Sequence, residues 1–116
     1  MMTLEHLSPG YAVRPQIALS EIAGIAAAGY KGIVNARPDG EEAGQPASSE
    51  IEAEARRHGL AYWYLPVVPG TLTEEQARAL DRALAEADGP VIGYCKSGNR
   101  AGNLWKLARS LDQPTC

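Results

Sequence analysis

One cysteine and one arginine stand at a spacing that suits anion chemistry. Cys95 follows the apolar run Pro90-Val91-Ile92-Gly93-Tyr94, and Arg100 completes a Cys-x(4)-Arg segment. Apolar residues then recur at helical spacing: Ala101, Leu104, Trp105, Ala108 and Leu111. A strand that passes through a glycine-containing loop into a helix N-terminus directs backbone N–H groups toward an anion. A Cys95 thiolate held there is stabilised by those dipoles and by Arg100, which predicts a reactive cysteine rather than an inert one.

The residues of this segment have predicted roles. Cys95 is the nucleophile, and Arg100 pairs with the thiolate or with an anionic substrate because its planar fork suits phosphate and sulfonate oxygens. The predicted substrate-binding residues are Lys96, Ser97, Gly98, Asn99 and Ala101 in the segment, with Arg37 and Asp39 on another loop. Gly98 or Asn99 is expected to adopt a positive φ. An ion pair that closes the turn at Pro38 is an equally weighted alternative for Arg37 and Asp39.

The composition is that of an ordinary globular protein. The 116 residues, with 45% hydrophobic and 22% charged content, suit one domain over residues 1–116. The net charge of −3 argues against a nucleic-acid partner, no apolar run is long enough for a membrane helix, and no signal peptide is recognisable. No cofactor is indicated, and no His, Cys and Asp residues have metal-site spacing. With only Cys95 and Cys116, a reduced, cytoplasmic protein is expected, and Cys116 is predicted to be a tail residue rather than a resolving thiol.

Strand and helix patterns alternate along the chain. The predicted strands are 11–13, 31–37, 60–68 and 90–95, and the predicted helices are 21–28, 49–59, 73–87 and 101–111. Helix caps are predicted at Ser20, at Ser49 with Glu52, and at Thr73 with Gln76. This order predicts an α/β fold in which helices flank a central, largely parallel sheet of four to five strands. The loops at 37–42, 66–71 and 95–100 then share the rim formed by the carboxyl ends of the strands.

Nearly the whole chain resembles the phosphatase-like domain found at the N-terminus of beta-lactamase-like hydrolases. Three segments carry the resemblance: Arg37-Pro38-Asp39-Gly40-Glu41, Leu65-Pro66-Val67 and the Cys95 loop. The resemblance implies a protein-tyrosine-phosphatase-like fold of the dual-specificity type, sulfur-transfer activity, and a hydrolase or an oxidoreductase as functional partner. The chain departs from the family pattern at Ala101, where a serine is usual.

Two cysteine chemistries compete for this loop. The protein tyrosine phosphatase pattern is Cys-x(5)-Arg followed by Ser or Thr, with an Asp on a neighbouring loop that protonates the leaving oxygen. This chain has one residue fewer between Cys95 and Arg100, Ala101 in the hydroxyl position, and no Asp or Glu in residues 66–71. Asp39 is the remaining candidate for the acid.

A sulfurtransferase makes smaller demands on the site. Its thiolate attacks a sulfane sulfur and expels a stabilised anion that needs no acid, and the Cys-x(4)-Arg loop length resembles that of rhodaneses. The main prediction is therefore a rhodanese-like enzyme that forms a Cys95 persulfide from a small anionic sulfur donor and passes the sulfur to a thiol acceptor. A phosphatase that acts on a phosphate ester through a phosphocysteine is the first alternative. A non-catalytic module that binds an anion or senses redox state is the second.

Overall fold

A five-stranded sheet forms the centre of the computed structural model, which describes residues 4–112. In chain order the strands are β1 (Glu5–Ser8), β2 (Tyr11–Arg14), β3 (Gly32–Asn35), β4 (Ala61–Tyr64) and β5 (Val91–Tyr94). Their order across the sheet is β1-β2-β5-β3-β4. The pairs β2–β5, β5–β3 and β3–β4 are parallel, and β1 pairs with β2 in the antiparallel sense. The predicted α/β class with a largely parallel sheet is confirmed.

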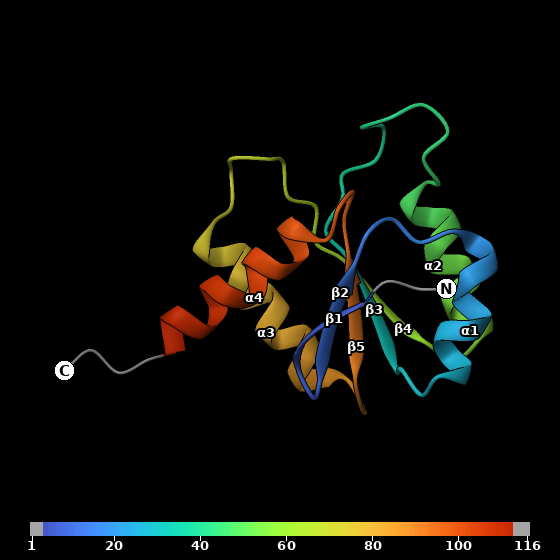
Figure 1. Ribbon diagram of the computed structural model, residues 1–116, viewed down its shortest axis with the longest axis horizontal. Coiled ribbons are helices and arrows are strands. Elements are labelled where there is room, and N and C mark those ends of the chain that lie inside the picture. Colours follow the sequence, from blue (N-terminus) through green and yellow to red (C-terminus); the bar gives the residue numbers. More distant parts are fainter. Residues whose placement is uncertain (1–3, 113–116) are drawn as a thin grey trace.

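Helices cover both faces of the sheet. A short 3-10 turn, η1 (Leu19–Glu21), leads into α1 (Ile22–Ala27), and the later helices are α2 (Ser48–Arg57), α3 (Glu74–Glu86) and α4 (Asn99–Asp112). Figure 1 shows α1 and α2 on one face and α3 and α4 on the other. None of the helices within residues 4–112 is long and apolar enough to cross a membrane.

Alternation along β5 divides its side chains between two cores. Val91 and Cys95 belong to the core under α3 and α4, whereas Ile92 and Tyr94 belong to the core under α1 and α2. Successive side chains of a strand point to opposite faces, so a cysteine directly after Tyr94 continues the α4 side. The sheet thus directs Cys95 toward the start of the helix that follows it.

The capping predictions are partly confirmed. Thr73 Oγ1 accepts a hydrogen bond from the Gln76 N–H at 3.1 Å, and Gln76 Oε1 accepts one from the Thr73 N–H, as expected. The caps predicted at Ser20 and Ser49 are wrong. There, carboxylates of the first turn accept the N–H at the helix start, Glu21 from Ala18 and Glu50 from Ala47.

Three loops meet at one edge of the sheet. Residues 36–47 follow β3, residues 65–73 follow β4, and residues 95–98 follow β5. Because these strands are parallel, the loops lie together at the upper edge of the sheet in Figure 1. The predicted rim is confirmed, and we call these segments the β3 loop, the β4 loop and the Cys95 loop.

Candidate active site

The Cys95 loop closes tightly around the sulfur. Cys95 has no exposed surface, and its Sγ accepts a hydrogen bond from the Gly98 N–H at 3.0 Å. Gly98 has a φ of +97°, which confirms the expected positive φ at one of its two predicted positions. A Cβ at Gly98 would also lie 3.3 Å from the backbone of Arg14, so both conformation and space favour glycine.

Helix α4 begins at Asn99, two residues before the predicted start. Arg100 is therefore in the first turn of a 14-residue helix, and the Asn99 N–H is bonded to Ser97 Oγ at 3.3 Å. Lys96 and Ser97 are exposed between the strand and this helix. The positive end of the helix dipole consequently lies at the Cys95 loop, where it favours a bound anion.

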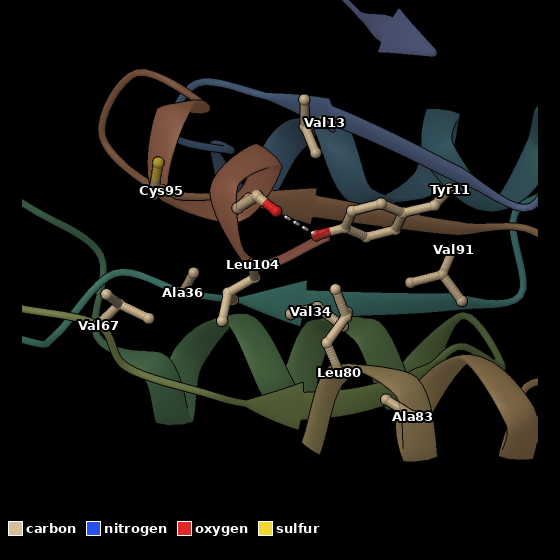
Figure 2. Close-up of a cluster of buried hydrophobic side chains, with 11 residues drawn as sticks. Tyr11, Val13, Val34, Ala36, Val67, Leu80, Ala83, Val91, Cys95 and Leu104 are labelled. Carbon is tan, nitrogen blue, oxygen red and sulfur yellow. Dashed lines mark hydrogen bonds between the residues drawn. The ribbon is translucent and has the colours of Figure 1, made fainter. Parts of the chain in front are cut away.

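Ala101, directly after Arg100, packs into the core next to the Cys95 loop. It is fully buried, and its carbonyl accepts a hydrogen bond from the Tyr11 hydroxyl at 3.1 Å, the dashed line in Figure 2. Burial, with a smaller contribution from nearby Cys95, raises the pKa of Tyr11 and keeps its hydroxyl a neutral donor. A Cβ at Gly93 would lie 2.1 Å from this hydroxyl, so the glycine makes room for Tyr11. Ala101 was predicted to bind substrate; its observed contacts are with the core.

Arg100 is held from two sides. Its Nη1 donates to Glu41 Oε2 at 2.6 Å and to the Val67 carbonyl at 2.8 Å, and its Nη2 donates to Glu41 Oε1 at 2.9 Å. The side chains of Arg100 and Glu41 are 15% and 22% exposed, so solutes can reach this pair. The hydrogen bond to Glu41 raises the pKa of Arg100, burial opposes that rise, and the nearby Cys95 sulfur adds to it. The guanidinium therefore interacts with both the Glu41 carboxylate and the cysteine.

Glu41 joins both arginines of the rim. Besides its two contacts with Arg100, its Oε1 accepts a hydrogen bond from Arg37 Nε at 2.9 Å. The hydrogen bond from Arg100 lowers the pKa of Glu41 to about 2, partial burial opposes this, and Arg37 lowers it further. The carboxylate is ionised at neutral pH and serves as an acceptor for both guanidinium groups.

Arg37 is a buried centre of hydrogen bonds for the β3 loop. Its side chain is only 3% exposed, and it donates to Glu41, to Glu42 and to the side-chain carbonyl of Gln16. Asp39 has other partners: its Oδ1 accepts the Ser48 N–H at the start of α2, and its own N–H donates to the Tyr64 hydroxyl. Arg37 thus forms its ion pairs with Glu41 and Glu42, and not with Asp39 as the sequence alternative had it. Substrate-binding roles for Arg37 and Asp39 stay predictions.

A cavity of about 280 Å³ opens beside Arg100. Residues of the β4 loop and of α4 line it: Val67, Gly70, Leu72, Arg100 and Asn103. It combines apolar side chains with the guanidinium and a side-chain amide. A substrate whose anionic group contacts Arg100 has room here for the rest of the molecule.

Several functional contacts were not predicted. Glu41 and the Val67 carbonyl both hold Arg100, and Tyr11 supports Ala101. Glu41 was visible in sequence only as an acid in the loop expected to border the Cys95 loop. Within residues 4–112 no group of His, Cys, Asp and Glu side chains could hold a metal ion. Cys116 lies outside the described residues.

Solved structures of other proteins share this fold. A Neisseria meningitidis protein described as a candidate phosphatase matches with a TM-score of 0.84 and 27% identity, over 94% of this chain and 78% of that one. Pseudomonas aeruginosa TpbA, solved in complex with phosphotyrosine, matches with a TM-score of 0.63 and 20% identity, over 89% and 59%. The fold is that of the protein-tyrosine-phosphatase-like class.

The family is narrower than this class. The model of the phosphatase-like domain of beta-lactamase hydrolase-like proteins matches residues 3–112, and the chain belongs to this family. A beta-lactamase hydrolase-like protein of Agrobacterium fabrum is 44% identical over 94 residues, which are 81% of this chain and 22% of the relative. One of Xylella fastidiosa is 40% identical over 111 residues, 96% of this chain and 26% of the relative. The chain spans about a quarter of the length of these relatives.

These similarities change the order of the functional predictions. They support a phosphatase-like enzyme domain, which was the first alternative from sequence, and they do not support the sulfurtransferase that was the main prediction. The sulfurtransferase was expected because the Cys-x(4)-Arg loop is short and residues 66–71 contain no acid. This chain, with its four-residue spacing between Cys95 and Arg100, matches the model of a phosphatase-like domain over residues 3–112.

Proposed function

We propose that this domain hydrolyses phosphate monoesters through a phosphocysteine on Cys95. The position of the Cys95 sulfur carries the proposal: it lies at the N-terminus of α4, in hydrogen-bond contact with Gly98 and beside the Arg100 guanidinium. Backbone N–H groups at a helix start and a planar guanidinium are suited to hold the oxygens of a phosphoryl group. Membership of the phosphatase-like family supports the same assignment.

The reaction proceeds in two displacements. With the phosphoryl oxygens on Arg100 and on the loop N–H groups, the Cys95 thiolate attacks phosphorus and the ester oxygen leaves with a proton. Water then attacks the phosphocysteine and releases phosphate, which restores the thiolate. Because Glu41 occupies donors on both Nη1 and Nη2 of Arg100, the substrate must displace Glu41 from Arg100, and the loop must open to expose the buried Cys95 sulfur.

The surroundings suggest the substrate class. A cavity of about 280 Å³ beside Arg100 has both apolar walls, from Val67 and Leu72, and a polar one from Asn103, so it suits an ester group that is itself partly apolar. We therefore expect a phosphate ester with a partly apolar alcohol. A nucleophilic thiol also has to stay reduced, which keeps a cytoplasmic location our expectation.

Sulfur transfer is the second candidate, and loop length favours it. Four residues separate Cys95 from Arg100, and residues 66–71 supply no carboxyl group to a leaving oxygen. Sulfite and thiolates leave as stable anions without such a group. A persulfide on Cys95 would use the same loop and the same guanidinium.

One parallel assay separates the two candidates. The protein is given an aryl phosphate or thiosulfate with a thiol acceptor, and released phosphate, transferred sulfur and intact mass are measured. We expect phosphate release and a phosphoryl adduct, both lost in Cys95→Ser and retained in the matched control Cys116→Ser. Sulfur addition to Cys95 without any phosphate release would establish the sulfurtransferase instead.

A further inference from the structure

The leaving oxygen of a phosphate ester needs a proton, and the β4 loop has no side chain to give it. Residues 66–71 contain no Asp or Glu, although the Val67 carbonyl of this loop contacts Arg100. Asp39 is occupied at the start of α2, where its Oδ1 accepts the Ser48 N–H at 2.8 Å. Glu42 pairs with Arg37, and its side chain is 58% exposed. Within residues 4–112, the carboxylate that contacts Arg100 is Glu41.

We propose that Glu41 is the proton donor to the leaving group. The substrate itself releases Glu41 from Arg100, because the phosphate oxygens replace the carboxylate as acceptors of the Arg100 hydrogen bonds. This assignment rests on the proposed phosphatase function. In the present state both Glu41 oxygens lie on Arg100, at 2.6 and 2.9 Å, in the side-by-side geometry with which a guanidinium binds phosphate. Glu41 thus occupies the Arg100 donors that the substrate oxygens require.

Exchange of these partners changes the electrostatics at Glu41. While Arg100 donates to it, its pKa is about 2, and it holds no proton to give. A phosphate dianion on Arg100 removes the largest cause of that shift and places negative charge close to the carboxylate, and both effects favour protonation. Arg37 still donates one hydrogen bond to Glu41, but its other N–H groups donate to Glu42 and Gln16. Of the other charged groups, Lys96 interacts with Glu42, and Cys95 interacts with Arg100.

The proton balance of the two steps is closed. In the first step the sulfur–phosphorus bond forms, the bond from phosphorus to the ester oxygen breaks, and the Glu41 proton moves to that oxygen. The alcohol and a Glu41 carboxylate result. In the second step water adds to phosphorus, its proton passes to Glu41, and the sulfur–phosphorus bond breaks. Solvent supplies the proton that Glu41 takes up when the dianion first displaces it.

A series of esters with different leaving groups tests this role. Wild type, Glu41→Gln and the control Glu42→Gln are compared on 2,4-dinitrophenyl, 4-nitrophenyl and phenyl phosphate. Both variants remove one carboxylate from Arg37, but only Glu41 contacts Arg100 in the structure. We expect Glu41→Gln to lower kcat for phenyl phosphate by about 10²-fold or more and to change it little for the dinitrophenyl ester, whose anion leaves unaided. Glu42→Gln should behave like wild type throughout the series.

Binding of inorganic phosphate separates proton donation from simple support of Arg100. A neutral amide competes less for Arg100, so Glu41→Gln should bind phosphate at least as tightly as wild type in calorimetric titration. An equal loss of kcat for all three esters, or weaker phosphate binding, would overturn the assignment and make Glu41 a positioning residue. Wild type without hydrolysis of any ester would instead remove the proposed function, and the role of Glu41 with it.

Discussion

The β3 loop and the β4 loop border the same site but are held in different ways. Charged side chains organise the β3 loop around the buried Arg37, whose partners include Glu41 and Glu42. Backbone contacts organise the β4 loop: the Val67 N–H donates to the Ala36 carbonyl at 2.9 Å, and Val68 is 55% exposed. The difference indicates that ionic chemistry comes from the β3 side, whereas the β4 loop supplies a carbonyl and apolar walls.

Arg100 is the residue on which both loops converge, and its replacement should have the largest effect. A lysine keeps the charge but lacks the fork that serves Glu41 and the Val67 carbonyl together. We expect Arg100→Lys to lower kcat/KM for an aryl phosphate by about 10²–10³-fold, or about 2.7–4 kcal/mol. Steady-state kinetics measure the loss, and an unchanged melting profile shows that the fold is intact. Near-normal turnover would mean that Arg100 only joins the loops.

Removal of Arg37 should disrupt the β3 loop and leave the β4 loop in place. Arg37→Ala deletes a nearly buried guanidinium with charged partners, for which we expect a loss of about 2–3 kcal/mol in the free energy of unfolding. Arg56→Ala is the matched control, because Arg56 and Glu52 are 60% and 41% exposed and such pairs contribute at most about 1 kcal/mol. Urea denaturation of both variants makes the comparison. Equal losses would show that burial of Arg37 adds nothing.

Acid should weaken the β3 loop through Glu41. The pKa of this carboxyl falls from its ordinary 4.5 to about 2 on folding, so the unfolded chain binds its proton more tightly. Its contribution to stability is therefore complete above about pH 4.5 and is lost as the pH falls toward 2. We expect wild type to exceed Glu41→Gln by about 1–2 kcal/mol at neutral pH, a value reduced by solvent screening. Denaturation at several pH values measures the difference, and a difference that grows on acidification would contradict the pairing.

Local spacing was sufficient to predict the centre of the site but not its partners. Cys95, Gly98 and Arg100 lie within six residues, so a strand–loop–helix pattern places them together. The contact between Glu41 and Arg100 spans 59 positions and depends on how Arg37 folds the β3 loop. An acid in a polar loop gives no local sign of such a contact. The choice of sulfur transfer as the main prediction has a related cause: it gave weight to the missing acid in residues 66–71, and outside them it considered Asp39 alone, so the contact of Glu41 with Arg100 was missed.

Strand β1, two helix caps and the start of α4 were mispredicted for related reasons. β1 was not predicted because Glu5 and His6 are exposed, so no apolar alternation marks this edge strand. Serines at Ser20 and Ser49 suggested caps, but a carboxylate of the first turn can bond the helix start instead, as Glu50 does when it accepts the Ala47 N–H. The start of α4 was placed too late because Asn99 and Arg100 are polar and precede the apolar pattern. Segments with a pattern of buried apolar residues could be predicted from the sequence, whereas exposed polar segments such as β1 and the first turn of α4 could not.

The smallest effects on stability are expected from the residues that join each loop to the helix after it. In the β3 loop Asp39 accepts the first N–H of α2, and in the β4 loop Thr73 caps α3. Alanine at either position should lower the free energy of unfolding by about 1 kcal/mol, and Asp39→Asn, which keeps an acceptor, should retain most of it.

The activities of the two alanine variants should differ, because the two loops contribute differently to the site. Asp39→Ala loosens the segment that positions Glu41, so turnover of phenyl phosphate should fall several-fold, while Thr73→Ala should turn over like wild type. Urea denaturation and kinetics on the same preparations measure both quantities. If Thr73→Ala loses as much activity as Asp39→Ala, the β4 loop takes part in catalysis beyond its carbonyl, and the division of labour between the loops is wrong.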